Sequence, residues 1–227
     1  MRVLAIDPAL EACSAAVLET GPDGIVARES IAMSRGHAEA LMPLVARVLD
    51  RAELDFAAID RVAVTTGPGS FTGLRVGIAA ARGLGLAGGK PVVGISTLAA
   101  YAAPFLADDD SVPVVAVIDA RHDHVYLQVF GPGGRTVVTP RIASLREALR
   151  AAATGAPRLI GTAAEMLAAA WPADQRAPRL VDARRAPDVD WVARLGAAAT
   201  DTGVPPKPLY LRAPDAQPQN AAQLARR

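Results

Sequence analysis

A glycine-rich stretch at residues 67–77, GPGSFTGLRVG, has the residue types best suited to chemistry. It follows the strand-forming run 61–66 and precedes a helical pattern, so its N–H groups and the positive helix end could cradle a phosphate. Gly67, Gly69 and Ser70 are the candidate cofactor contacts. However, no lysine follows the last glycine, and the stretch does not match G-x-G-x-x-G. The alternative, which we favour, is a tight turn that prepares close helix packing.

Asp7 is the carboxylate best placed to act with that loop, because it ends the first predicted strand, RVLAI at residues 2–6. Pro8 and Ala9 follow it and bring no hydroxyl group to the turn, and Pro8 also lacks a backbone donor. Asp7 is therefore a candidate nucleotide contact on a poorly equipped hairpin. We expect no cofactor on this chain.

The histidines and the single cysteine offer little for a metal or a nucleophile. A zinc pair on the helix that starts at His37 would need its second ligand at position 41, where a leucine stands. We therefore interpret His37 as a capping or interface group. His122 and His124 lie in a predicted hairpin turn, where exposed polar residues are common, and Cys13 has the pattern of a small core residue. We expect no metal site and no catalytic acid–base pair.

The composition indicates closely packed α/β layers. Of the 227 residues, 51% are hydrophobic but only 4% are aromatic, and 24 basic residues nearly balance 23 acidic ones. Such a balance argues against unaided binding to nucleic acid. A lone cysteine fits a reducing compartment, and no apolar run reaches the ~20 residues that cross a membrane. The apolar run at the N-terminus is too short for a signal peptide. We therefore expect a cytoplasmic protein.

Two similar units position these residues. Residues 1–106 show three strands and then alternating helices and strands, and a shorter version of the pattern occupies 112–213. The last helix, 189–199, is expected to pack back on the first unit. The polar, proline-bearing tail 214–227 is expected to be disordered. A duplicated, hairpin-led sheet with α/β crossovers predicts an α/β protein of the actin-like ATPase (ASKHA, RNase H-like) fold, with two lobes of mixed β-sheet flanked by helices.

Two predicted helices carry faces suited to packing against another protein. Small residues recur every four positions in the helix after the glycine loop, which leaves a groove for a second helix. Glycine inside a helix costs about 0.5–1 kcal/mol relative to alanine, so this stripe needs a reason. The preceding helix adds an apolar face of its own. The expected partner interface comprises His37, Leu41, Val45, Val48, Gly73, Gly77 and Ala81.

Five stretches resemble a known family. They are SRGHAEALMPLV at 34–45, GPGSFTGLRVG at 67–77, PVVGISTL at 91–98, VIDARHDHVY at 117–126 and PLYLRAP at 208–214. In this order, over nearly the whole chain, they resemble the TsaB (YeaZ) family of bacterial tRNA threonylcarbamoyladenosine-biosynthesis proteins. The resemblance implies the actin-like fold. It also implies kinship with TsaD, which transfers threonylcarbamoyl to the adenosine next to the tRNA anticodon.

The resemblance further implies a subunit that is not an enzyme on its own. TsaD holds a metal with two histidines four residues apart, and the matching positions here are Thr97 and Tyr101, which are not usual ligands. The implied role is to stabilise and activate TsaD, and to meet the ATPase TsaE through that pair. ATP and metal are then expected on TsaD, and tRNA only within the complex. In isolation the chain is expected to form a homodimer.

Three other functions remain open on the residues alone. A stand-alone tRNA binder is the first, although the near-zero net charge argues against it. An active actin-fold transferase or kinase would bind ATP and magnesium without a partner. A metallopeptidase, as the older glycoprotease name of the wider family implies, would need metal ligands, and the histidine pair is missing.

Overall fold

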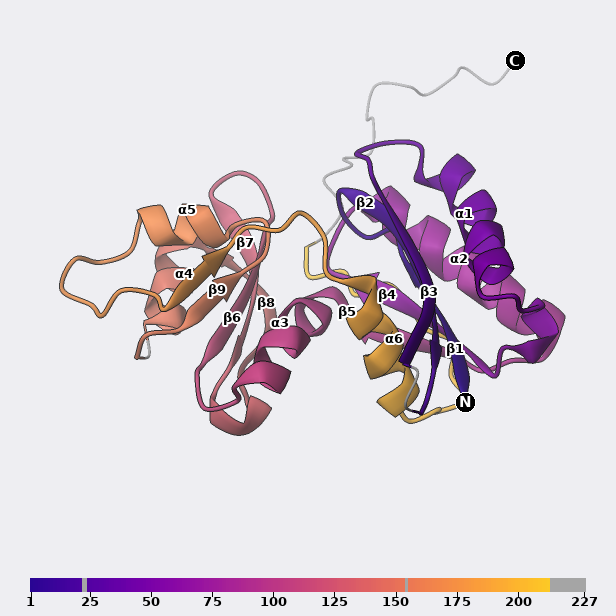
Figure 1. Ribbon diagram of the computed structural model, residues 1–227. Helices are drawn as coiled ribbons and strands as arrows, with labels where there is room; N and C mark the ends of the chain where they lie inside the picture. The colour runs from indigo at the N-terminus through magenta and orange to yellow at the C-terminus, as the bar shows by residue number, and fades with distance from the viewer. Residues whose placement is uncertain (22–23, 154, 213–227) are drawn as a thin grey trace, which may run out of the picture.

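The computed structural model describes residues 1–21, 24–153 and 155–212, which form two lobes, each built on a five-stranded sheet (Figure 1). The tail at 214–227 lies outside the described residues. The first sheet has the order β3-β2-β1-β4-β5, and the second has the same order, β8-β7-β6-β9-β10. The predicted actin-like α/β fold, with two lobes of mixed β-sheet, is confirmed.

The first sheet combines an antiparallel hairpin-led half with a parallel half. Its strands are β1 (Arg2–Asp7), β2 (Ala12–Glu19), β3 (Gly24–Ala32), β4 (Arg61–Gly67) and β5 (Val92–Ser96). Alternate residues of β1 face opposite layers, so Leu4 packs with α1 (His37–Arg51) and α2 (Phe71–Gly88), whereas Val3 packs under α6 (Val189–Ala198). Helices therefore cover both faces, which is why nearly every residue of β1 and β2 is buried.

The second sheet repeats this plan with shorter elements. Its strands are β6 (Val114–Asp119), β7 (His124–Phe130), β8 (Thr136–Ser144), β9 (Arg158–Ile160) and β10 (Leu180–Asp182). The helices α4 (Leu145–Ala152) and α5 (Ala164–Ala169) pack on one face, where Val115 and Leu127 lie. The other face, with Val114 and Ile118, packs against α3 (Thr97–Asp108).

The two halves of the chain exchange their last helices. Helix α3 directly follows β5 of the first sheet but lies against β6 of the second, and α6 follows β10 but lies against β1 and β4 (Figure 1). Helix α3, which connects the two sheets in sequence, completes a core on the second sheet, and α6 completes a core on the first. The hydrophobic layers of the two lobes therefore depend on each other. Within the described residues, no helix is long and apolar enough to span a bilayer.

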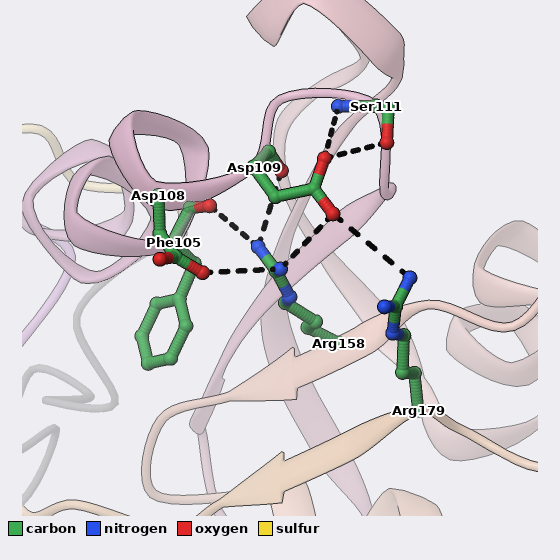
Figure 2. A network of polar contacts seen from close by, with 6 residues as sticks. All are labelled: Phe105, Asp108, Asp109, Ser111, Arg158 and Arg179. Atoms are coloured by element: carbon green, nitrogen blue, oxygen red, sulfur yellow. Dashed lines mark hydrogen bonds and ion pairs between the residues drawn. The ribbon is translucent and has the colours of Figure 1, made fainter.

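Two arginines fasten the exchanged helices at their C-terminal ends. Figure 2 shows Arg158, the first residue of β9, donating to the carbonyls of Phe105 at 2.5 Å and Asp109 at 3.1 Å. Its side chain also pairs with the Asp109 carboxylate at 3.5 Å. Arg61, the first residue of β4, donates to the carbonyls of Gly196 at 2.9 Å and Ala199 at 2.7 Å at the end of α6. Both arginines satisfy carbonyl groups that a helix end leaves without an intrahelical partner.

Candidate functional site

The glycine loop is filled by the chain's own β1–β2 turn. The Ser70 N–H donates to the Ala9 carbonyl at 2.7 Å, and a Cβ atom at Gly69 would collide with the same carbonyl. A Cβ at Gly73 would collide with the Pro8 carbonyl, and one at Gly77 would lie 2.6 Å from the Pro8 ring. Glycine is needed at these three positions because the turn approaches the helix so closely. The loop is therefore a tight turn that packs closely on the β1–β2 turn, with the Pro8 and Ala9 carbonyls against it.

Asp7 is buried behind that turn, with an exposed fraction of 1%. Its Oδ1 accepts hydrogen bonds from the Thr65 hydroxyl at 2.7 Å and the Ala9 N–H at 3.0 Å. Its Oδ2 has no partner among the residues that the structure describes. Burial raises the pKa of Asp7 above its ordinary value, although the two hydrogen bonds and the charge of His37 act in the opposite direction. The carboxyl group thus holds the hairpin together from inside.

The other candidate cofactor contacts serve the turn itself. Gly67 has φ +111°, a conformation that favours glycine, and Ser70 caps α2 by accepting a hydrogen bond from the Gly73 N–H at 3.3 Å. Gly69 packs on Ala9 as described above. These residues form the junction between β4 and α2, and the polar groups of Ser70 are used within the chain.

The positions aligned with the TsaD metal ligands are buried at the start of α3. Tyr101 donates from its hydroxyl to the Arg184 carbonyl at 3.1 Å, and burial together with the charge of Asp7 raises its pKa. Thr97 is fully buried, and its hydroxyl has no partner in the described part of the chain. His122 is exposed in the β6–β7 turn, and His124 is exposed as the first residue of β7. Among the residues described, no group of three or more His, Cys, Asp or Glu side chains is arranged to hold a metal ion.

The expected partner interface needs a correction, because its residues are buried inside the first lobe. Leu41, Val45, Val48 and Ala81 belong to the core between α1, α2 and the first sheet, and Gly73 and Gly77 are covered by Pro8. His37 is buried as well, and its Nε2 lies 3.0 Å from the Leu10 carbonyl. The sequence predicts that the apolar stripe and the small-residue stripe face a partner, but both pack against the chain itself. A leucine at position 77 would therefore disturb the fold before any docking.

The surface of α2 is instead formed by residues that the sequence patterns did not single out. Phe71, Arg75, Ala79 and Leu86 face outward, and Leu86 is 87% exposed. A cavity of about 530 Å³ lies beside Leu86, between the end of α2 and residues 201–205. At the other end of the helix, Phe71 and Arg75 contact Tyr210. The helical periodicity of α2 is enough to predict which of its residues face outward, but only the structure shows that Tyr210 lies beside Phe71.

Fold and site together define an actin-like protein whose glycine loop is closed from within by its own hairpin turn. The family model described as TsaD, tRNA N6-adenosine threonylcarbamoyltransferase, matches residues 17–179. The chain belongs to this family, and within it the chain is a TsaB/YeaZ-like protein.

The relatives support this assignment over different lengths. The Escherichia coli tRNA threonylcarbamoyladenosine biosynthesis protein TsaB is 40% identical over 126 residues, which cover 56% of this chain and 53% of that protein. The chain thus matches about half the length of this curated relative. An uncharacterized Mycobacterium tuberculosis protein, Rv3421c, is 37% identical over 95% of this chain and 94% of its own. The solved structure of YeaZ from Pseudomonas aeruginosa superposes with a TM-score of 0.78 at 30% identity, covering 92% of this chain and 99% of that one.

Proposed function

We propose that the chain is the non-catalytic subunit that stabilises and activates TsaD in N6-threonylcarbamoyladenosine formation on tRNA. The observation that carries the proposal is the glycine loop filled by Pro8 and Ala9, in a chain that belongs to the TsaD family. A phosphate bound at this loop would have to displace the turn, which Asp7 fixes from the buried side. The chain therefore keeps the architecture of its enzymatic relatives but contributes a surface in place of a reaction centre. TsaE would join through the TsaD pair, and the cytoplasm, where tRNA is modified, is the proposed place of action.

The proposed TsaD-binding face is the outer surface of α1 and the C-terminal half of α2. Met42 on α1 is 45% exposed, and Ala79, Gly83 and Leu86 are exposed along α2. Small residues at 79 and 83 permit a partner helix to approach closely, and Leu86 with the adjacent cavity offers an apolar anchor and a recess. Because the chain belongs to the TsaD family, TsaD is expected to present a related helical face, and that face would pack against this surface. The same face would pair two copies of the chain when TsaD is absent.

Co-expression with TsaD from the same organism tests the proposal. The wild-type chain is expected to co-purify with TsaD, and Leu86→Arg is expected to abolish capture while the melting temperature stays unchanged, because residue 86 is almost fully exposed. Met166→Arg is the matched control, since Met166 is an exposed apolar residue on α5 of the other lobe. Failure of the wild type to capture TsaD would refute the function. Equal capture by both variants would refute the face.

The ATP-dependent alternative predicts a different result on the isolated chain. Titration calorimetry with ATP and magnesium is expected to give no heat of binding, because Pro8 and Ala9 occupy the loop. Tight binding without TsaD would favour the transferase or kinase instead.

A further inference from the structure

Phe71, Arg75 and Tyr210 form a compact aromatic–arginine platform, a name used below for these three residues. The rings of Phe71 and Tyr210 have centroids 5.3 Å apart with an interplanar angle of 31°. The Arg75 guanidinium lies 4.0 Å from the Phe71 ring centroid, and its Nε donates to the Tyr210 hydroxyl at 3.2 Å. Each ring nevertheless remains 44% exposed. The three side chains therefore order one another without being buried.

The platform is held in place from both sides. Phe71 begins α2, directly after the junction that Ser70 caps. Tyr210 lies on the segment 206–212, where the Leu209 N–H donates to the Thr66 carbonyl at 2.7 Å. Arg212, two residues after Tyr210, donates to the Ala120 carbonyl of the second lobe at 3.0 Å. A platform fixed in this way loses little conformational entropy when a flat ligand stacks on it.

The two sequence segments that supply the platform carry charges of a single sign. From residue 61 to residue 107 there is no Asp or Glu, and the same is true from 202 to 212. These two segments supply all three platform residues, and they carry Arg75, Arg82, Lys207 and Arg212 among their basic residues. The near-neutral charge of the whole chain conceals this local asymmetry, because the acidic residues lie elsewhere in the sequence.

We propose that the platform binds an unpaired nucleotide of RNA, with a base stacked on the exposed Phe71 and Tyr210 rings and a phosphate paired with Arg75. Aromatic side chains stack on any base, and the planar guanidinium group matches the geometry of a phosphate. Aromatic and arginine residues also anchor protein interfaces. The acid-free segments favour a polyanion over a protein surface of mixed charge. The inference rests on the proposed function, in which tRNA is the substrate of the complex, and it names the part of this chain that would touch it.

The test uses the full-length chain and a fluorescein-labelled, single-stranded RNA dodecamer of mixed sequence at about 150 mM salt. The wild type is expected to bind within the range of non-specific affinities, Kd about 10⁻⁴ to 10⁻⁶ M. Phe71→Ala and Tyr210→Ala are each expected to weaken binding about tenfold through lost stacking. Arg75→Gln is expected to lower the slope of log Kd against log salt by about 1, because one phosphate contact is removed.

Two controls separate stacking from structure. Tyr210→Phe keeps the ring and is expected to bind as the wild type does, whereas Met166→Ala removes an exposed apolar side chain on α5 of the other lobe and is expected to leave RNA binding unchanged. Ultraviolet crosslinks to the dodecamer, mapped by mass spectrometry, are expected on the peptides that carry Phe71 and Tyr210. Melting temperatures identify any variant that is merely misfolded.

The outcomes that overturn the inference are distinct from failure of the proposed function. Absence of RNA binding by the wild type, or equal binding by the alanine variants, overturns the RNA platform. RNA binding that persists while Phe71→Ala and Tyr210→Ala lose TsaD would assign the platform to a protein partner and would also overturn it. Loss of TsaD capture by the wild type refutes the proposed function whatever the RNA result.

Discussion

Arg61 and Arg158 occupy the same position of the duplicated fold. Each is the first residue of the strand that lies parallel to the central strand of its sheet: Arg61 pairs with Val3 of β1, and Arg158 pairs with Val114 of β6. Each donates to the carbonyls at the end of the helix that arrives from the opposite half, α6 for Arg61 and α3 for Arg158. The two arginines therefore bind the C-terminal ends of the two exchanged helices in the same way.

Truncation of Arg158 is expected to destabilise the protein more than its ion pairs alone suggest. Its side chain is 8% exposed and satisfies carbonyls at the end of α3, so Arg158→Ala leaves acceptors without a donor (Figure 2). The expected loss in the free energy of unfolding is about 1–3 kcal/mol. Arg179→Ala is the matched control, because that arginine is 62% exposed and pairs with Asp109 only at 3.9 Å. Urea unfolding of both variants measures the difference, and equal losses would contradict the capping role.

Two glycines of α2 are expected to respond in opposite directions to alanine. A Cβ at Gly73 collides with the Pro8 carbonyl, so Gly73→Ala must displace the β1–β2 turn and lowers the melting temperature. Gly83 is exposed on the same helix and has open space within the described structure, so Gly83→Ala is expected to gain about 0.5–1 kcal/mol from helix propensity. Thermal unfolding followed by circular dichroism compares them. A stabilised Gly73→Ala protein would mean that the turn does not occupy the glycine loop.

The buried carboxyl of Asp7 is expected to make stability depend on pH. Burial raises the pKa of Asp7 in the folded chain above its ordinary value of 3.8, so the folded state holds a proton that the unfolded state has released. The stability that this group contributes is fully present below pH 3.8 and is lost as the pH rises through the folded value, with a slope of up to about 1.4 kcal/mol per pH unit.

Asp7→Asn isolates this contribution. The amide oxygen can accept the hydrogen bonds from Thr65 and Ala9, and the amide does not ionise, so the variant imitates the protonated acid. The difference in unfolding free energy between wild type and variant is measured from pH 4 to pH 8, where all other titrating groups are shared. Wild type is expected to lose stability relative to the variant with rising pH. A constant difference would show that Asp7 is ionised in the folded protein throughout.

The Cys13 thiol is expected to be inert in the native protein. Burial and the negative charge of Asp7 raise its pKa to about 11, which leaves almost no thiolate at neutral pH. A thiol reagent such as Ellman's reagent is expected to label Cys13 only after denaturant is added. Stoichiometric labelling of the folded chain within minutes would contradict the structure, and Asp7→Asn should leave the result unchanged because burial is the larger cause.

The sequence patterns predicted the helices and strands better than they predicted the contacts between them. The strand run before Gly67 and the duplicated order of strands and helices are local signals, and the structure contains both. The role of the Gly73–Gly77–Ala81 stripe depends on what lies opposite, and the residue that fills most of it, Pro8, is distant in sequence. Periodicity identifies a face that packs but does not identify its partner. For the same reason no pattern could place Tyr210 against Phe71, because that contact joins segments more than one hundred residues apart.

The exchange of α3 and α6 has a consequence for how such a chain can be divided. If the chain were cut between α3 and β6, each half would have one sheet face without the helix that covers it. Each half would also have one helix without the sheet on which it packs. A half-length protein with this topology would bury that face only by giving its last helix to a second copy and receiving the copy's helix in return. The core of each lobe is thus completed by a helix from the other half of the chain, and neither half is expected to fold without the other.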